Sequence, residues 1–224
     1  MGFSAQWEHV YRRGGQYSTW PWSDLVSYVM RYARPDGSPY RVLELGVGAG
    51  ANIPFFLNFG ADYSGTEGSA TAVQQVQQRF AGAKNFRIAC CDFTAVIPFL
   101  GPFDLVADRS SLTHNGTAAI RRCLQLLTHI LRPGGMLIGI DWFSTANGEF
   151  LTGRELEDHY TRGDFPAGQF RDVGTVHFSD EQHLRDLLGH ANFRISRLEH
   201  KQSDTLFPSE EKRMAWWNFV AVKP

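Results

Sequence analysis

The chain has 224 residues, of which 43% are hydrophobic and 20% are charged. A chain of this length can bury one full hydrophobic core, so we expect a single domain over residues 1–224. Its 22 Lys and Arg residues balance 23 Asp and Glu residues, so no basic surplus favours nucleic acid or anionic membrane, and no apolar run is long enough to span a bilayer. The three cysteines include no CxxC pair and the histidines lack metal-ligand spacing, so we expect neither a disulfide framework nor a metal site. The N-terminus lacks a secretory apolar stretch, which predicts a cytoplasmic protein.

The first 38 residues are predicted to form a helical cap, with a helix around Leu25 to Tyr32. Aromatic residues are frequent in this segment. They are expected to pack over the sheet or to close as a lid on a ligand, in which case Tyr11 and Tyr17 supply hydroxyls to a substrate.

A short apolar strand, Tyr40–Leu45, runs into the sequence Glu44-Leu-Gly-Val-Gly-Ala-Gly50. Glycines in such a turn let the backbone approach a ligand, and amides at the following helix start face it. The pattern indicates a nucleotide-cofactor loop. Gly46, Gly48 and Ala51 also match the dinucleotide pattern, so NAD is a competing cofactor. Glu44 disfavours a pyrophosphate beside the loop and favours the cationic amine or sulfonium of S-adenosylmethionine.

Strand-like and helix-like segments then alternate, which predicts a parallel α/β sheet whose ligands lie beyond the carboxyl ends of its strands. Three predicted strands, 62–66, 86–91 and 103–107, are followed by Glu67, Asp92 and Asp108. Glu67 has the spacing from the first glycine at which an acid accepts hydrogen bonds from ribose hydroxyls. The alternative is a helix-start carboxylate beside Ser69. Asp92 suits an exocyclic amine, or is an ordinary turn aspartate.

The C-terminal half begins with an amphipathic helix from Thr117, which Pro133-Gly134-Gly135 stops, and a strand over 136–140. Residues 145–178 show little periodicity and are too long for an idle connection, so we interpret them as an insertion that lines an acceptor pocket. Ser179 with Gln182 predicts a capping box for a helix closed by Gly189, and two strands over 193–198 and 215–222 follow. The substrate contacts predicted in this half are Trp142, His159 and Tyr160.

Five motifs together resemble class I S-adenosylmethionine-dependent methyltransferases: the glycine loop, Gly65-Thr-Glu67-Gly-Ser69, Cys91-Asp92-Phe93, Phe103-Asp-Leu-Val106 and Leu131-Arg-Pro-Gly-Gly135. The resemblance implies a Rossmann-like three-layer α/β/α sandwich, with a mostly parallel seven-stranded sheet in the order 3-2-1-4-5-7-6 and strand 7 antiparallel. It also implies S-adenosyl-L-methionine as methyl donor and S-adenosyl-L-homocysteine as product. The implied cofactor residues are Glu44, Gly46, Gly48, Gly50, Asn52, Glu67, Gly68, Ser69, Asp92, Phe93 and Asp108.

Methyl transfer from a sulfonium is an in-line displacement, so the protein mainly orients the acceptor, and a hydroxyl acceptor needs a base. The stretch Asp108–Asn115 leaves the fourth strand toward the methyl group and resembles the Asp-Arg-small segment of thiopurine and tellurite-resistance methyltransferases. His114 is the candidate base, because histidine titrates near neutral pH, and a structural or solvated histidine is the alternative. Asp108 and Arg109 complete the predicted catalytic set, with a buried ion pair as their alternative role.

The absence of an Asn-Pro-Pro-Tyr segment or a Pro-Cys pair after the fourth strand disfavours methylation of nucleic-acid bases. We therefore predict transfer to a small molecule, at a hydroxyl of a sugar or another metabolite, with no nucleic-acid or membrane partner. Two alternatives remain at this level: an NAD-dependent oxidoreductase and a non-catalytic methyltransferase-like subunit.

Overall fold

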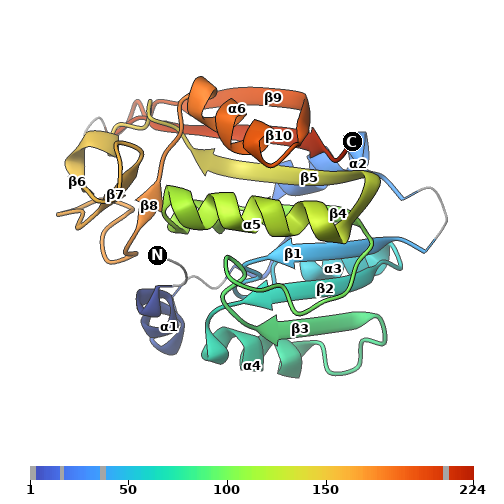
Figure 1. The fold of residues 1–224 in the computed structure, drawn as a ribbon. Helices are drawn as coiled ribbons and strands as arrows, with labels where there is room; N and C mark the ends of the chain where they lie inside the picture. Colours follow the sequence, from blue (N-terminus) through green and yellow to red (C-terminus); the bar gives the residue numbers. More distant parts are fainter. Residues whose placement is uncertain (1–3, 16–17, 36–38, 209–211) are drawn as a thin grey trace.

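A seven-stranded sheet forms the centre of the computed structural model, which describes residues 4–15, 18–35, 39–208 and 212–224 (Figure 1). The strands lie in the order β3-β2-β1-β4-β5-β10-β9, and β10 is antiparallel to both of its neighbours while the remaining pairs are parallel. The predicted order and the antiparallel last strand are confirmed. The strands are β1 (Arg41–Leu45), β2 (Asp62–Glu67), β3 (Phe86–Cys90), β4 (Phe103–Arg109), β5 (Leu131–Phe143), β9 (Arg194–Ser203) and β10 (Met214–Val222).

Helices cover both faces of this sheet, which gives three layers. Strand β1 is buried on both faces, which explains its apolar residues. Val42 packs in the core on one face, and Leu43 and Leu45 pack in the core on the other. One face carries α2 (Ser23–Tyr32), α3 (Ile53–Asn58) and α4 (Ala70–Arg79), and the opposite face carries α5 (Thr117–Ile130) and α6 (Glu181–His190).

Strand β5 is longer than the predicted 136–140 because the tertiary ladder extends it. Its last residues pair with β10, where Trp142 lies opposite Trp217. The predicted capping box is wrong: helix α6 is capped by Asp180, whose carboxylate accepts the backbone N–H of His183 at 2.7 Å. The helix also continues through Gly189 to His190.

The 145–178 segment is more ordered than its sequence indicates. It contains β6 (Arg154–Glu155), β7 (Thr161–Gly163) and β8 (Val176–His177), which form a separate antiparallel sheet, and the short helix η2 (Phe150–Thr152). A satellite core of aromatic residues supports it, made by Phe150, Phe165, Phe170 and Phe178.

Two segments lie near the carboxyl ends of the parallel strands, at the left of Figure 1. One is the small sheet, and the other is helix α1 (Ala5–Arg12), which contacts α4. Both segments therefore stand beside the edge of the sheet at which α/β folds bind ligands. Among the described residues, none of the helices has the length and apolar character required to cross a membrane.

Candidate cofactor and acceptor site

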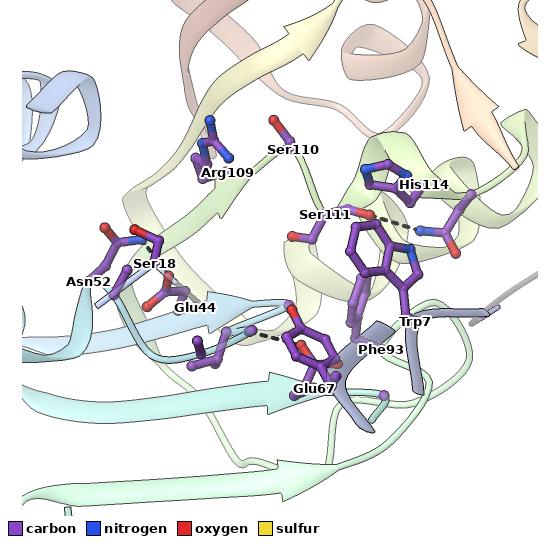
Figure 2. Close-up of a pocket in the computed structure, with 18 of the residues that line it drawn as sticks. Trp7, Ser18, Glu44, Asn52, Glu67, Phe93, Arg109, Ser110, Ser111 and His114 are labelled. Carbon is purple, nitrogen blue, oxygen red and sulfur yellow. Dashed lines mark hydrogen bonds between the residues drawn. The ribbon is translucent and has the colours of Figure 1, made fainter. Parts of the chain in front are cut away.

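A pocket opens at the carboxyl edge of β1, β2 and β4, with about 960 Å³ of empty space that is partly open to solvent (Figure 2). Its walls come from the glycine loop, the residues that follow β2, β3 and β4, helix α1 and the segment before α2. In Figure 2 Glu44 and Asn52 lie on one side of it, and Trp7, Phe93 and His114 on the other.

The glycine loop forms the floor of the pocket. Gly46 and Gly48 have φ angles of +58° and +56°, a conformation that L side chains rarely adopt. A Cβ on Gly46 would lie 2.3 Å from the Cβ of Ser111, so the loop and the segment after β4 approach each other only with glycine there. Gly50 lies outside the pocket lining and faces Ile53 of α3 and Val76 of α4, so its role as a cofactor contact stays a prediction.

Glu67 borders the pocket and ties the glycine loop to helix α4. Its carboxylate accepts the backbone N–H groups of Gly48 at 2.9 Å and of Ser69 at 2.8 Å. Burial raises the pKa of Glu67, and these amides oppose that shift. Gly68 also borders the pocket, whereas Ser69 does not: its hydroxyl accepts the N–H of Ala72 as the α4 cap and donates to Glu8. Ser69 therefore caps α4, and its role as a cofactor contact stays a prediction.

Glu44 is a nearly buried carboxylate at the base of the pocket. It accepts hydrogen bonds from Asn52 Nδ2 at 2.8 Å and from the Tyr63 hydroxyl at 2.6 Å. Burial raises the pKa of Glu44 to about 7. The role of Tyr63 could not be predicted from the sequence, because a buried strand position gives no sign that its hydroxyl reaches an acid on the neighbouring strand.

Asp92 and Phe93 border the pocket beyond the end of β3. Asp92 Oδ1 accepts both the backbone N–H and the hydroxyl of Thr94, at 2.9 and 2.7 Å. These bonds hold the carboxylate in a turn at the pocket wall. Asp92 can therefore stabilise the turn and still contact a ligand.

Asp108 is completely buried and lies outside the pocket lining, although it was predicted to act in catalysis or on the cofactor. It accepts the Trp142 indole N–H at 2.6 Å, the Leu112 N–H at 3.0 Å and the Ser111 hydroxyl. Burial raises the pKa of Asp108 to about 6. Trp142 is also fully buried and is not the predicted pocket wall. Together they anchor the segment that follows β4.

Arg109 borders the pocket and is held from two sides. Two of its nitrogens lie 2.9 Å from Asp141 Oδ2, and its guanidinium lies 3.6 Å from the centre of the Trp22 ring. The predicted alternative, a pair with Asp108, is wrong because Asp108 points into the core. Arg109 therefore presents a fixed cationic wall.

His114 ends the short helix η1 (Leu112–His114) and borders the pocket. The Trp7 ring stands edge-on at 4.7 Å between ring centres, and Phe143 lies at 5.7 Å. Nδ1 is buried and has no hydrogen-bond partner among the described residues. Burial lowers the pKa of His114 to about 4, so the imidazole is neutral near pH 7.

Of the remaining predicted acceptor contacts, some line the pocket and others do not. Tyr11 borders the pocket, and Tyr17 lies outside the described residues. His159 and Tyr160 precede β7 in the small sheet and do not line the pocket: His159 packs edge-on against Phe150. None of residues 145–178 lines it. Strand β8 of the insertion contacts η1, the short helix that carries His114, and a place for the insertion in an acceptor pocket stays a prediction.

The sheet order and a ligand pocket at the glycine loop define a Rossmann-like methyltransferase fold. Residues 42–135 match the family model of a methyltransferase domain, and the predicted enzyme class is confirmed. A comparison with curated protein sequences gives no match.

Solved structures of S-adenosylmethionine-dependent methyltransferases share this fold. One from Methanosarcina mazei is 16% identical with a TM-score of 0.69, over 91% of this chain and 98% of that chain. One from Clostridium acetobutylicum is 15% identical with a TM-score of 0.65, over 97% and 96%. The 1,6-didemethyltoxoflavin-N1-methyltransferase of Burkholderia thailandensis is 18% identical with a TM-score of 0.62, over 90% and 77%.

Proposed function

We propose that this protein transfers the methyl group of S-adenosylmethionine to a hydroxyl of a small molecule. The observation that carries the proposal is one pocket in which the glycine loop, Glu67 and Asp92 face the neutral imidazole of His114. Two methyltransferases of similar fold hold S-adenosylhomocysteine, one with 1,6-didemethyltoxoflavin and one with phosphomonomethylethanolamine, which supports a small-molecule acceptor.

Each wall of the pocket has a role in this proposal. Glu67 accepts the ribose hydroxyls, Asp92 and Phe93 meet the adenine, and Gly46 and Gly48 let the methionine part approach the backbone. Buried Glu44 offers negative charge to the amine and sulfonium. When bound, the cofactor supplies the electrophilic methyl group, and the surrounding aromatic walls exclude water.

His114 accepts the proton of the acceptor hydroxyl. Its ring borders the pocket, and its neutral form near pH 7 can take up a proton. A base with a lowered pKa takes protons best from acidic donors, so we favour a phenolic or enolic hydroxyl over an alcohol.

Calorimetry with S-adenosylhomocysteine tests the cofactor part of the proposal. We expect saturable binding to one site on the folded protein. Binding of NADH with energy transfer from tryptophan, and no binding of S-adenosylhomocysteine, would instead favour the dinucleotide alternative. Cofactor binding without turnover on any acceptor would favour the non-catalytic subunit.

Affinity for S-adenosylmethionine should depend on pH through Glu44. Its pKa is about 7, so the carboxylate is neutral in acid, where it no longer attracts a cation. We expect the dissociation constant to rise on acidification from pH 8 to pH 5.5, by up to about tenfold per pH unit below 7. Glu44→Gln should abolish this dependence, while Glu155→Gln, at an exposed position on β6, should preserve it. A pH-independent constant in the native protein contradicts the role of Glu44.

The role of His114 is tested by His114→Ala. With an acceptor that is turned over, kcat should fall by about 10²–10⁴ because general-base catalysis is lost. Affinity for S-adenosylhomocysteine should stay within twofold, because the proposed cofactor contacts come from other residues. Full activity of the variant removes histidine from the mechanism.

A further inference from the structure

The pocket at the glycine loop contains a cationic side chain to which the proposed function assigns no role. Arg109 is the only Lys or Arg residue among the described residues that line this pocket, whereas three acids, Glu44, Glu67 and Asp92, line it as well. An anionic group that leaves water without a partner loses much of its solvation energy. An anionic part of a ligand in this pocket would therefore be drawn to Arg109.

The Arg109 guanidinium is held in place before any ligand binds. Its Nε donates to Asp141 Oδ2 at 2.9 Å, its Nη2 lies 2.9 Å from the same oxygen, and the Trp22 ring centre lies 3.6 Å from its central carbon. Trp22 is itself fixed, because its backbone N–H donates to Asn52 Oδ1 at 3.1 Å. A guanidinium that is already oriented loses less conformational entropy when it binds a ligand.

The contacts of Arg109 leave one edge of the guanidinium open. Asp141 occupies the edge formed by Nε and Nη2, and Trp22 covers a face of the planar group. Nη1 forms no hydrogen bond with the described residues, and 30% of the side chain is exposed. Asp141 lies outside the pocket lining, so a ligand meets the N–H donors of Nη1 and Nη2. Two parallel donors of this kind match the two oxygens of a carboxylate.

Arg109 and Glu44 leave neighbouring strands on the same face of the sheet. Glu44 of β1 lies opposite Ala107 of β4, and Arg109 is the second residue beyond Ala107. Side chains alternate between the two faces of a strand, and Val42 and Ala107 belong to the same core cluster. Figure 2 shows Arg109 and Glu44 on the side of the pocket away from His114. This part of the pocket thus presents a cation and an anion to one ligand.

We propose that Arg109 is the residue of this pocket that binds a ligand carboxylate. Two carboxylates fit this position. One is at the amino-acid end of the methyl donor, whose amine is assigned to Glu44, and the other is an acidic group on the acceptor. The identity of the ligand rests on the proposed function, whereas the carboxylate site follows from the described contacts of Arg109.

Calorimetry with two donor-side ligands tests the first source. S-adenosylhomocysteine is compared with S-adenosyl-3-thiopropylamine, which lacks only the carboxylate. Arg109→Gln removes the charge and the paired donors, so S-adenosylhomocysteine should bind about ten- to a hundredfold more weakly, while the analogue changes by less than about twofold. Arg109→Lys keeps the charge without the planar pair of donors and should give an intermediate loss.

A second pair of ligands tests the acceptor as the source. Binding of 4-hydroxybenzoate and of 4-hydroxybenzamide is measured on protein saturated with S-adenosylhomocysteine. If the acceptor carries the carboxylate, the native protein should prefer the benzoate, and Arg109→Gln should lose that preference by about the same factor. The affinity ratio of the donor-side pair should then be equal in the native and variant proteins.

Arg132→Gln is the matched control, since Arg132 also pairs with an aspartate, Asp104, and lies outside the pocket lining. It should change neither ratio. Unchanged ratios for both ligand pairs in Arg109→Gln overturn the proposal, and so does an equal loss for all four ligands, which a packing role predicts. If that variant does not fold, Arg109→Lys decides by the same ratios. A native protein that binds no S-adenosylhomocysteine contradicts the proposed methyl transfer, and the second pair alone then decides the role of Arg109.

Discussion

Replacing Glu67 with alanine should weaken the binding of S-adenosylhomocysteine by about ten- to a hundredfold, the equivalent of roughly 1.5–3 kcal/mol for a charged hydrogen bond. Two losses combine in this variant. The ribose hydroxyls lose their acceptor, and the N–H groups of Gly48 and Ser69 lose the carboxylate that holds the loop against α4. Calorimetry on the native and variant proteins measures the change.

The control for Glu67→Ala is Glu181→Ala. Glu181 is an exposed carboxylate on α6 that pairs with Arg185, far along the chain from the pocket-lining residues, and its removal should leave the dissociation constant unchanged. Far-ultraviolet circular dichroism establishes that both variants are folded. Equal affinity of Glu67→Ala and the native protein contradicts the assigned ribose contact.

Replacing Asp108 with alanine should lower the free energy of unfolding by roughly 3–5 kcal/mol, because a buried acceptor of several donors is removed. The Trp142 indole, the Leu112 amide and the Ser111 hydroxyl all lose their partner in a fully buried site. Urea denaturation measures the loss. The energy of burying the carboxylate, visible as its raised pKa, offsets part of the effect.

Asp108→Asn separates acceptor geometry from charge. Its carbonyl oxygen can still accept from one or two of the three donors, so we expect a smaller loss than with alanine. Asp204→Ala, at an exposed aspartate that pairs with Arg213, should change stability by less than about 0.5 kcal/mol. A loss below about 1 kcal/mol for Asp108→Ala, in the range of ordinary point mutations, would show that the buried network is not a major anchor.

Much of the fold could be predicted because its signals are local. The apolar run before the glycines is buried on both faces, as in β1, and such runs identify central parallel strands from sequence alone. The predicted strand boundaries were wrong where pairing with a neighbouring strand sets the end of a strand. Strand β5 extends to Phe143 because β10 pairs with it there, and no residue within 141–143 announces that pairing.

At the site, the sequence predicted the backbone positions better than the directions of the side chains. A glycine at positive φ and an acid at the end of a strand are recognisable in the sequence, because each depends on the local backbone. Gly46, Gly48 and Glu67 accordingly border the pocket as expected. Side-chain direction has no such signature. Asp108 also follows a run of apolar strand residues, yet it turns into the core toward Trp142.

The sequence by itself determined the order of strands, the glycine loop at the end of β1 and the enzyme class, because periodicity, glycine positions and strand-end acids are encoded within a few residues of each other. Only the tertiary structure decided that the 145–178 insertion forms a small separate sheet and that Trp7 and Phe143 pack against His114. These contacts join segments that lie far apart in the sequence and meet only when the domain packs.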